Sequence, residues 1–302
     1  MVEIVDLVKT YDKGTVTAVD HVSLSVKKGE LFGLIGPDGA GKTSIFRVLT
    51  TLLLPDEGFA TVAGLDVVKD YKQIRKLVGY MPGRFSLYQD LTVEENLNFF
   101  ASVFNTTVEE NYDLIKDIFI QIEPFKDRRA GKLSGGMKQK LALCCALIHK
   151  PQILFLDEPT TGVDVVSRKE FWEMLTKLKD QGITILVSTP YMDEATLCER
   201  IGLIQNGKIL SVATPEEIID QYPDPLYAIK SDAMGKLLKD LRNYTYIKTC
   251  NAFGEYHHIS FKDSLADPVQ GLVEFLRNEN QKNIEIKEIK ASIEDCFISL
   301  MN

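Results

Sequence analysis

A glycine-rich segment ending in lysine and threonine is the first place where this sequence could do chemistry. Residues 36–43 read Gly-Pro-Asp-Gly-Ala-Gly-Lys-Thr and fit the pattern G-x-x-x-x-G-K-[ST]. Backbone N–H groups of such a loop can close around phosphates, and the start of a following helix favours negative charge. Lys42 would neutralise the β- and γ-phosphates, and Thr43 would bind Mg²⁺ through its hydroxyl. The predicted nucleotide loop comprises Gly36, Pro37, Asp38, Gly39, Ala40, Gly41, Lys42 and Thr43.

An apolar run ending in two carboxylates is the second candidate. Residues 153–156, Ile-Leu-Phe-Leu, are followed by Asp157 and Glu158. The carboxyl ends of strands are where open α/β sheets bind ligands. Asp157 would orient Mg²⁺ and its water, and Glu158 would polarise the attacking water as a general base. Taken alone, a solvated acidic pair would be the plainer interpretation, and the phosphate loop outweighs it.

A serine followed by two glycines marks a second site for anions. Residues 133–139 read Leu-Ser-Gly-Gly-Met-Lys-Gln. Ser134 can cap a helix running through Cys145, and Gly135 and Gly136 expose backbone donors at the start of that helix. A capped surface helix that binds nothing is the alternative interpretation.

Alternating strand and helix patterns supply the frame for these motifs. Apolar or β-rich runs at residues 2–8, 19–26, 31–35, 152–156 and 183–188 predict strands. The run at 31–35 leads directly into the phosphate loop, and a helix-compatible stretch follows the loop through Leu53. Strands that alternate with helices are typical of an α/β fold with a parallel sheet.

A helical segment interrupts this alternation. Residues 91–149 are mostly helical in pattern, and Thr92-Val93-Glu94-Glu95 forms a capping box. We interpret residues of about 85–150 as a helical subdomain inserted into the core. Further on, Asn206-Gly207 between apolar flanks predicts a hairpin turn.

The last quarter of the chain has a rhythm of its own. Two prolines within residues 222–225 predict a linker, and the elements beyond it follow a βαββαβ order. That order suggests a small ferredoxin-like α+β domain at residues 222–302, after a larger domain at residues 1–221. The predicted elements are strands at 226–230, 246–250, 257–261 and 284–289, helices at 233–243, 268–278 and 293–301, and a hairpin turn at 251–254.

Composition limits the classes of protein to consider. The 302 residues are 45% hydrophobic and 26% charged, as in ordinary globular proteins. The longest clear apolar run, residues 141–148, is far below the roughly 18 residues that a membrane helix needs. The acidic, strand-like start does not resemble a signal peptide, so we expect any membrane contact to go through another protein. A net charge of −8 argues against nucleic acid as the main partner.

Neither the cysteines nor the histidines form a metal-binding pattern. The five cysteines are odd in number and contain no Cys-x-x-Cys, which favours packed thiols in a reducing cytosol. Of the four histidines, His257 and His258 are adjacent. Because neighbours on a strand point to opposite faces, we expect no shared metal site there.

The three motifs together resemble the ATP-binding domains of ABC transporters, and the resemblance covers residues 1–221. In that family two ATP molecules lie between two such domains, and each site combines one domain's phosphate loop with the other's Ser-Gly-Gly signature. The resemblance implies ATP and Mg²⁺ as ligands and a P-loop core with a mixed sheet. Residues 161–164, Thr-Gly-Val-Asp, resemble the D-loop, although Val165 stands where proline is common, and Tyr11 matches the aromatic residue that stacks on adenine.

Several further segments are similar to the ATPases of ABC-2, drug-exporter-type systems. These systems export drugs, lipids, polysaccharides or ions, and the sequence does not choose among them. The resemblance implies separate membrane permeases as partners, a second ABC domain, and a place on the cytoplasmic face of the membrane. The similar segments are residues 79–82, 85–88, 90–97, 130–132 and 293–297, together with the Gly-Pro-Asp-Gly start of the phosphate loop.

Two positions depart from the family pattern. Gly83 stands where the family has a glutamine that reaches Mg²⁺ and the attacking water, and Pro190 stands where it has a switch histidine that bonds the γ-phosphate. Glycine has no side chain, and proline has neither a donor side chain nor a backbone N–H. Gln89 lies too far along its loop to be taken as a substitute.

These departures predict slow hydrolysis at this chain's own site, because one preorganised contact is worth about 3 kcal/mol. The intact signature can still complete a partner's site, so we expect an asymmetric pair with a fuller ABC domain. A homodimer that tolerates Gly83 and Pro190 is an alternative, and so is a non-hydrolysing switch that ATP closes. A soluble ABC ATPase acting on ribosomes or DNA is disfavoured, because the chain has neither tandem ATPase domains nor a long coiled coil.

Overall fold

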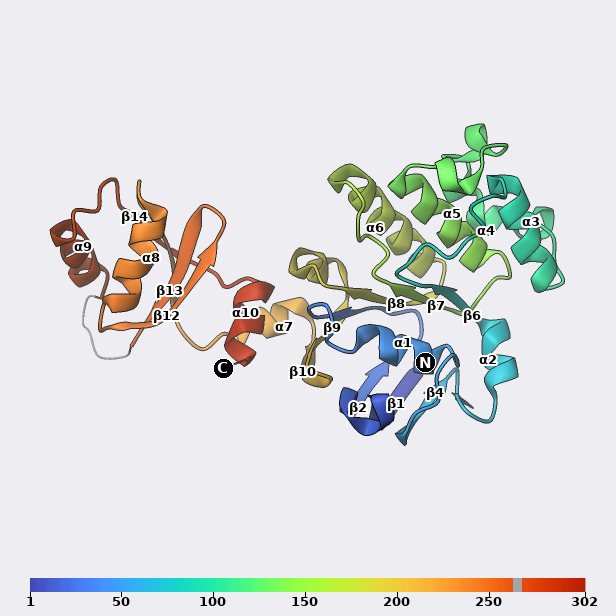
Figure 1. Ribbon diagram of the computed structural model, residues 1–302, viewed down its shortest axis with the longest axis horizontal. Helices are drawn as coiled ribbons and strands as arrows, with labels where there is room; N and C mark the ends of the chain where they lie inside the picture. The colour runs from blue at the N-terminus through green and yellow to red at the C-terminus, as the bar shows by residue number, and fades with distance from the viewer. Residues whose placement is uncertain (263–267, 302) are drawn as a thin grey trace. The chain divides into compact units, whose positions relative to one another are not determined.

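The chain forms two compact units, Met1–Pro215 and Glu216–Asn302. The computed structural model describes residues 1–262 and 268–301, and Figure 1 shows its elements in sequence colours. The boundary between the units falls at the start of helix α7 (Pro215–Asp220), slightly ahead of the predicted linker at residues 222–225.

An antiparallel sheet carries the N-terminal strands. Its strand order is β2-β1-β4-β5, and every neighbouring pair is antiparallel. The turn η1 (Asp12–Gly14) joins the first two strands and places Tyr11 at the end of its strand. The strands are β1 (Val2–Tyr11), β2 (Val16–Val26), β4 (Glu57–Val62) and β5 (Leu65–Asp66).

A six-stranded sheet of order β10-β9-β3-β8-β7-β6 carries the predicted site motifs. Five of its strands are parallel, and β10 joins antiparallel through the predicted hairpin at Asn206 and Gly207, whose φ angles are 48° and 78°. The predicted mixed sheet is therefore confirmed. The strands are β3 (Leu31–Ile35), β6 (Val78–Met81), β7 (Ile153–Asp157), β8 (Thr184–Thr189), β9 (Arg200–Gln205) and β10 (Lys208–Ala213).

Helix α1 (Lys42–Leu49) packs between the two sheets, where the ring of Phe46 meets Phe155 of β7 edge-on at 5.8 Å. It ends at Leu49 rather than at the predicted Leu53. Thr51 has a left-handed φ of 62°, and the N–H groups of residues 52 and 53 both donate to the carbonyl of Arg47, which turns the chain out of the helix. Helix α2 (Tyr71–Leu77) precedes β6, and helix α6 (Val165–Asp180) and the turn η5 (Met192–Leu197) flank β8.

The helical subdomain lies between β6 and β7 in the chain, as predicted, and on the opposite side of the parallel sheet from the antiparallel strands (Figure 1). It contains α3 (Val93–Val103), α4 (Tyr112–Phe119) and α5 (Gly135–Leu147), with short turns η2 (Glu109–Asn111), η3 (Glu123–Phe125) and η4 (Ala130–Lys132). The predicted capping box is present, since the Thr92 hydroxyl accepts from the N–H of Glu95 and the Glu95 carboxylate accepts from the N–H of Thr92.

Asn96 of α3 fixes the loop before its own helix. Its side chain is fully buried; Oδ1 accepts from the N–H of Tyr88 at 3.0 Å, and Nδ2 donates to the carbonyls of Tyr88 at 3.0 Å and Thr92 at 2.8 Å. The same loop holds the segment that leads into Ser134, because the N–H of Gly131 donates to the carbonyl of Gln89 at 2.9 Å.

The C-terminal unit has the predicted ferredoxin-like order. Its sheet runs β12-β13-β11-β14 with all neighbours antiparallel, and leucines of α8 and α9 pack on one face. The hairpin turn lies at residues 254–255 instead of the predicted 251–254. Strand β12 continues through Phe253, and Gly254, with its positive φ, begins the turn. The elements are β11 (Leu226–Lys230), α8 (Met234–Asn243), β12 (Ile247–Phe253), β13 (Tyr256–Phe261), α9 (Pro268–Asn278), β14 (Glu285–Ile289) and α10 (Ile293–Leu300).

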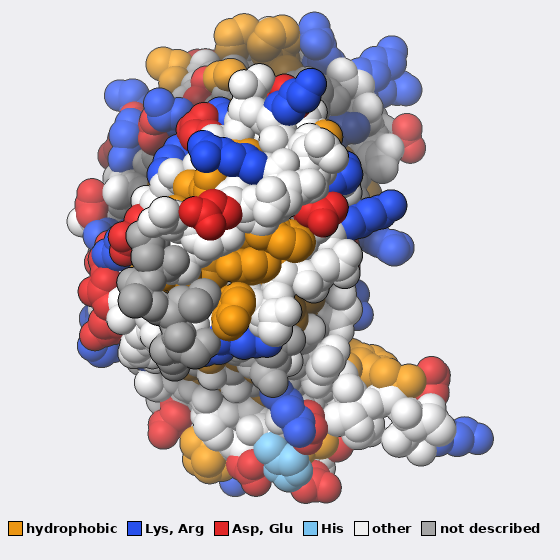
Figure 2. All heavy atoms as spheres, turned by 90° about the vertical axis from the view of Figure 1, so that its left-hand side faces the viewer, with side chains coloured by type: hydrophobic (Ala, Val, Ile, Leu, Met, Phe, Trp, Pro, Cys, Tyr) orange, Lys and Arg blue, Asp and Glu red, His pale blue; other side chains and the backbone are white. Residues whose placement is uncertain are grey.

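The adjacent histidines of β13 point to opposite faces, as predicted. His257 contacts the carbonyl of Met234 in α8 at 2.9 Å, whereas His258 contacts the buried carboxylate of Asp295 in α10 at 2.9 Å. On the face of the molecule drawn in Figure 2, side chains of both charge signs are interspersed and hydrophobic side chains gather near the middle. Across residues 1–262 and 268–301, no helix combines the length and apolarity needed to cross a bilayer.

Replacing Asn96 with alanine should destabilise the N-terminal unit by about 2–3 kcal/mol, because partly buried N–H and C=O groups of the 88–92 loop lose their partner. The measurement is urea unfolding followed by fluorescence of Trp172, the single tryptophan and a buried residue of this unit. Asn98→Ala, an exposed asparagine of the same helix, is the control and should change stability by less than about 0.5 kcal/mol. Equal effects of the two variants would contradict the assignment.

Candidate functional site

The phosphate loop runs from the end of β3 to the start of α1, as predicted, and two of its glycines have no room for a side chain. A Cβ on Gly36 would lie 2.1 Å from the carbonyl oxygen of Ile204, and one on Gly41 would lie 2.2 Å from that of Ala18. Gly41 also has a φ of 106°, which residues with side chains rarely adopt. The loop is therefore held close to its neighbours, and the first N–H groups of α1 lack helical partners and can bind an anion.

Lys42 crosses beneath this loop. Its side chain is 2% exposed, and its ammonium donates to the carbonyl oxygens of Gly36 at 2.8 Å and Pro37 at 3.0 Å. The ammonium also lies 3.2 Å from Oε1 of Glu158. The two predicted groups, the cation for phosphate and the general base, thus meet in one place.

Asp157 is the buried centre of the site. Thr43 Oγ1 donates to its Oδ2 at 2.8 Å, and Ser188 Oγ of β8 donates to its Oδ1 at 2.6 Å. The structure therefore brings together the two predicted metal ligands, Thr43 and Asp157. A hydroxyl and a carboxylate are the oxygen donors that Mg²⁺ prefers, so these residues fit the ion.

Ser188 is a site residue that the sequence prediction missed. Besides bonding Asp157, its backbone carbonyl and its hydroxyl each accept from the N–H of Glu158 at 3.0 Å. These bonds hold Glu158 in a left-handed conformation, with φ of 50°. In the sequence, Ser188 is only a hydroxyl residue near the end of an apolar strand. It can be assigned to the site only when β8 is known to pair with β7, which brings Ser188 opposite Asp157.

Tyr11 lies beside the phosphate-loop helix. Its hydroxyl is 3.1 Å from Oγ of Ser44 in α1, and the ring is half-buried at the end of β1. Tyr11 therefore lies next to the loop, and its stacking on adenine stays a prediction.

The Ser-Gly-Gly turn opens helix α5, as predicted. Ser134 Oγ accepts from the N–H of Met137 at 3.4 Å, and Ser134 and Gly135 are exposed. Gly136 is buried against helix α6, since a Cβ on Gly136 would lie 2.6 Å from Oγ of Ser167 in that helix. Within the described residues, no hydrogen bond or ion pair links residues 134–136 to residues 36–43 of the same chain. This predicted second anion-binding turn is therefore not bonded to the chain's own phosphate loop.

Gly83 lies directly against Asp157. A Cβ at this position would be 3.1 Å from the backbone oxygen of Asp157 and 3.8 Å from its Oδ2. A longer side chain here would start beside the carboxylate, and glycine supplies none. Gln89 does not replace it, because its side chain packs against Gly131 in the segment before Ser134.

Pro190 follows the last residue of β8. The preceding residue, Thr189, pairs with Ile35 of β3, and its carbonyl accepts from the N–H of Gly36 at 3.2 Å. Position 190 thus adjoins the start of the phosphate loop, and the proline there brings neither a side-chain donor nor an N–H.

Known proteins share this arrangement. A family model described as ABC transporter matches residues 19–161. The probable multidrug ABC transporter ATP-binding protein YbhF of Escherichia coli K12 is 41% identical over 233 residues, which are 74% of this chain and 40% of that protein. The doxorubicin resistance ATP-binding protein DrrA of Mycobacterium tuberculosis H37Rv is 32% identical over 306 residues, covering 97% of this chain and 91% of that protein.

A solved structure agrees with these relatives. The dimeric ATP-binding cassette MJ0796, bound to ADP and Pi in a post-hydrolysis state, superposes with a TM-score of 0.65 at 26% identity, covering 71% of this chain and 98% of that one. The predicted fold class and family are thereby confirmed. The chain spans 40% of the length of YbhF and most of the length of DrrA, and it belongs to the family of ABC transporter ATP-binding proteins.

Proposed function

We propose that this chain is the ATP-binding subunit of an ABC-2-type exporter and that its own nucleotide site hydrolyses ATP slowly. The surroundings of Asp157 carry the proposal. Thr43 and Ser188 hold the carboxylate from two sides, while the adjoining loops contribute a glycine and a proline where polar side chains would be needed.

The binding half of the site is complete. The phosphate loop and Lys42 would bind the phosphates of ATP, and Tyr11 would stack on the adenine. Thr43 and Asp157 would hold Mg²⁺, which supplies charge neutralisation at the phosphates when it is bound. Glu158, 23% exposed and tethered through its backbone to Ser188, would accept a proton from the attacking water.

The catalytic half lacks two contacts. Gly83 cannot reach the water or the metal, and Pro190 cannot donate to the γ-phosphate, although both residues adjoin the site. Each missing preorganised contact costs on the order of a hundredfold in rate, and the two losses need not multiply. Binding of ATP should therefore survive while turnover is slow.

The signature turn supports a role in a partner's site. Ser134 and Gly135 are exposed at the start of α5. Helix α6, whose Ser167 lies against Gly136, begins with Val165 and Val166, which are 79% and 68% exposed. We propose that this surface closes on the nucleotide of a second ABC domain, either a fuller one in a heterodimer or a second copy of this chain. The weak own site and the intact signature favour the heterodimer.

A groove beside the site offers a place for the permease. It has a volume of about 420 Å³ and lies between β6 and the helical subdomain, with an apolar lining. Tyr80 is one of the lining residues. Burial and the nearby Asp157 carboxylate raise the pKa of Tyr80 to about 12, so the phenol stays neutral. Because Met81 and Pro82 line the groove next to Gly83, an occupant would contact the chain directly beside the site. The apolar lining residues include Met81, Phe85, Leu87, Phe100, Val103 and Phe104.

We propose an amphipathic helix of a membrane permease as the occupant of this groove, which would place the chain at the cytoplasmic face of the membrane. The relatives are named for multidrug export and doxorubicin resistance, which supports export as the process. The transported compound would be chosen by the permease. The ferredoxin-like unit is proposed as an accessory domain, and nucleic acid is not proposed as a partner because the chain carries a net charge of −8.

A dimerisation switch that ATP closes without hydrolysis is the second candidate, and the observation in its favour is the pair Gly83 and Pro190. The position of Glu158, 3.2 Å from the Lys42 ammonium, favours some hydrolysis instead. Complete retention of ATP after long incubation, with no ADP formed, would select the switch.

Replacing Lys42 with methionine should weaken ATP binding by about 10- to 100-fold, because a charge-assisted contact to phosphate is worth roughly 1.5–3 kcal/mol. Titration with a fluorescent ATP analogue measures this. Lys69→Met, which removes an 83% exposed lysine, is the control and should bind as the wild type does. Unchanged affinity of the Lys42 variant would contradict the proposed phosphate site.

Pro190→His should raise ATP turnover of the purified chain about tenfold or more, because it adds a donor beside the phosphate loop. Gly83→Gln should also raise it, through a side chain starting 3.1 Å from the backbone of Asp157. Pro190→Ala and Gly83→Ala change the same positions without adding a donor and should stay near the wild-type rate. A wild-type rate of about 1 s⁻¹ or more, or no gain in either variant, would refute the slow site.

Val103→Asp should reduce co-purification of the permease about tenfold, because it places a charge in the apolar groove, while ATP affinity stays the same. Ile120→Asp is a closely matched control, since both side chains are 55% exposed but Ile120 lies outside the groove. The comparison uses membranes from cells that produce each full-length variant. Equal recovery of the permease with both variants would refute the docking site.

A further inference from the structure

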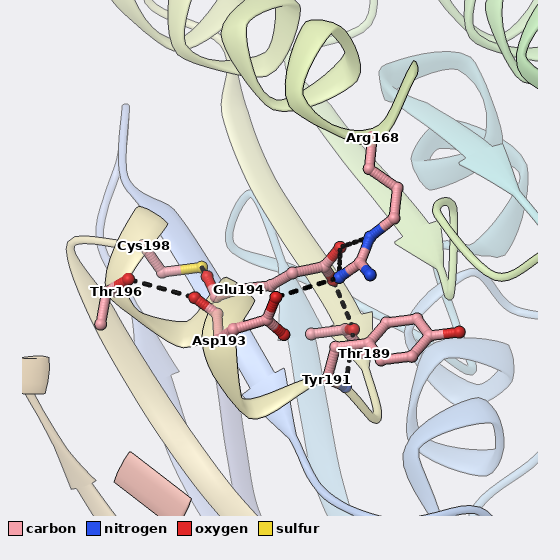
Figure 3. Close-up of polar contacts among 7 residues, drawn as sticks. All are labelled: Arg168, Thr189, Tyr191, Asp193, Glu194, Thr196 and Cys198. Atoms are coloured by element: carbon pink, nitrogen blue, oxygen red, sulfur yellow. Dashed lines mark hydrogen bonds and ion pairs between the residues drawn. The ribbon is translucent and has the colours of Figure 1, made fainter. Parts of the chain in front are cut away.

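A network of polar contacts surrounds the turn at Pro190 without involving that residue. Figure 3 shows Arg168 of helix α6 reaching toward the carboxylates of Glu194 and Asp193, with the ring of Tyr191 beside its guanidinium. Its Nη2 lies 3.0 Å from Oε1 of Glu194 and 3.4 Å from Oδ2 of Asp193, and its Nε lies 3.1 Å from the same Oε1. We call the group Arg168, Thr189, Tyr191 and Glu194 the 190 clamp.

Glu194 also bonds Thr189, the last residue of β8, and so links Arg168 to the end of that strand. Its side chain is 3% exposed, and its second oxygen, Oε2, accepts from the hydroxyl of Thr189 at 2.5 Å. Thr189 Oγ1 in turn accepts from the N–H of Tyr191 at 3.1 Å. The residues on both sides of Pro190 are therefore tied, through one hydroxyl, to one buried carboxylate.

Arg168 is the cation that this carboxylate requires. A buried carboxylate is costly unless it is paired and hydrogen-bonded, and the guanidinium supplies two N–H donors to it. The guanidinium also lies 4.2 Å from the centre of the Tyr191 ring, which adds a cation–π contact on the far side of Pro190. In the turn η5, the Thr196 hydroxyl donates to the carbonyl of Asp193 at 3.1 Å.

The 190 clamp also connects to the phosphate loop and to the signature turn, the two predicted nucleotide-binding segments. At one end, the carbonyl of Thr189 holds the N–H of Gly36, the first residue of the phosphate loop. At the other end, Arg168 lies in the first turn of α6, which Asp164 caps and whose Ser167 packs against Gly136 of the signature turn. The backbone N–H and the hydroxyl of Ser167 both donate to the Asp164 carboxylate. These two hydrogen bonds lower the pKa of Asp164.

We propose that Arg168 is a positioning residue, which acts through Glu194 and Thr189 to fix the backbone at position 190 next to the phosphate loop. The turn is thus already held where a donor at position 190 would meet the γ-phosphate, although proline provides no donor. This inference rests on the proposed slow site. A misplacement of about 1 Å can cost on the order of a hundredfold in rate, so a donor placed at 190 needs the clamp to be effective.

The experiment measures whether the gain from Pro190→His depends on Arg168. Arg168→Met keeps most of the side-chain stem but removes the guanidinium. In the Pro190→His background it should lower kcat about tenfold or more, while affinity for a fluorescent ATP analogue changes less than about twofold. Lys169→Met is the matched control from the same helical turn, because Lys169 is 80% exposed and its ion pair with Glu173 is long, at 4.0 Å.

A second pair of variants covers the case in which Arg168→Met impairs folding. Thr189→Val removes only the hydroxyl between Glu194 and Tyr191 and should also abolish the gain from Pro190→His, whereas Thr189→Ser keeps the hydroxyl and should preserve it. If the variants of Arg168 and Thr189 retain the full gain, the clamp is not a positioning device and the slow-site proposal stands. If neither Pro190→His nor Gly83→Gln gains over its alanine counterpart, the slow-site proposal itself fails and the inference falls with it; if Pro190→His alone shows no gain, the inference fails.

Discussion

The carboxylate of Asp157 is the interaction on which the site depends. It is 2% exposed, and a buried ionised group is tolerated only when hydrogen bonds replace water. Thr43 supplies one from helix α1 and Ser188 another from β8, so the Asp157 side chain joins two neighbouring strands, β7 and β8, to the helix that follows the phosphate loop. The placement of Glu158 follows, because Ser188 also accepts from its N–H. The phosphate-loop helix, the predicted general base and the predicted metal ligands are therefore positioned around one hydrogen-bonded carboxylate.

This construction separates binding from catalysis. The groups that would grip nucleotide lie on β3, α1 and β7, where the sheet core positions them. The missing groups belong to the segments after β6 and β8, where Gly83 and Pro190 stand. Only contacts that strengthen in the transition state accelerate the chemical step. On the proposed function, the lack of polar side chains at 83 and 190 would leave ground-state binding of ATP intact and lower the rate, as expected of a subunit that mainly completes another's site.

The sequence revealed those parts of the site that consist of contiguous residues. The phosphate loop, the capped signature helix and the acidic strand end each have a local pattern, and the structure places each as predicted. Ser188, Arg168 and Glu194 have no such pattern, because their roles arise from pairs 26 to 31 residues apart that only the folded sheet brings together. The early end of α1 was missed for a related reason, since the left-handed Thr51 leaves no mark in the hydrophobic periodicity.

The clamp around Pro190 explains why the turn keeps its place without a polar side chain at its centre. Removing Arg168 would leave Glu194 buried with a hydroxyl as its remaining side-chain donor, and breaking one partner of such a pair is strongly destabilising. The bonds of Glu194 to Arg168 and Thr189 therefore stabilise the network independently of the side chain at position 190. Because the carbonyl of Thr189 also accepts from the N–H of Gly36, the turn is bonded directly to the phosphate loop. On the proposed function, a chain can therefore lack a donor at 190 and keep the architecture that would bind ATP.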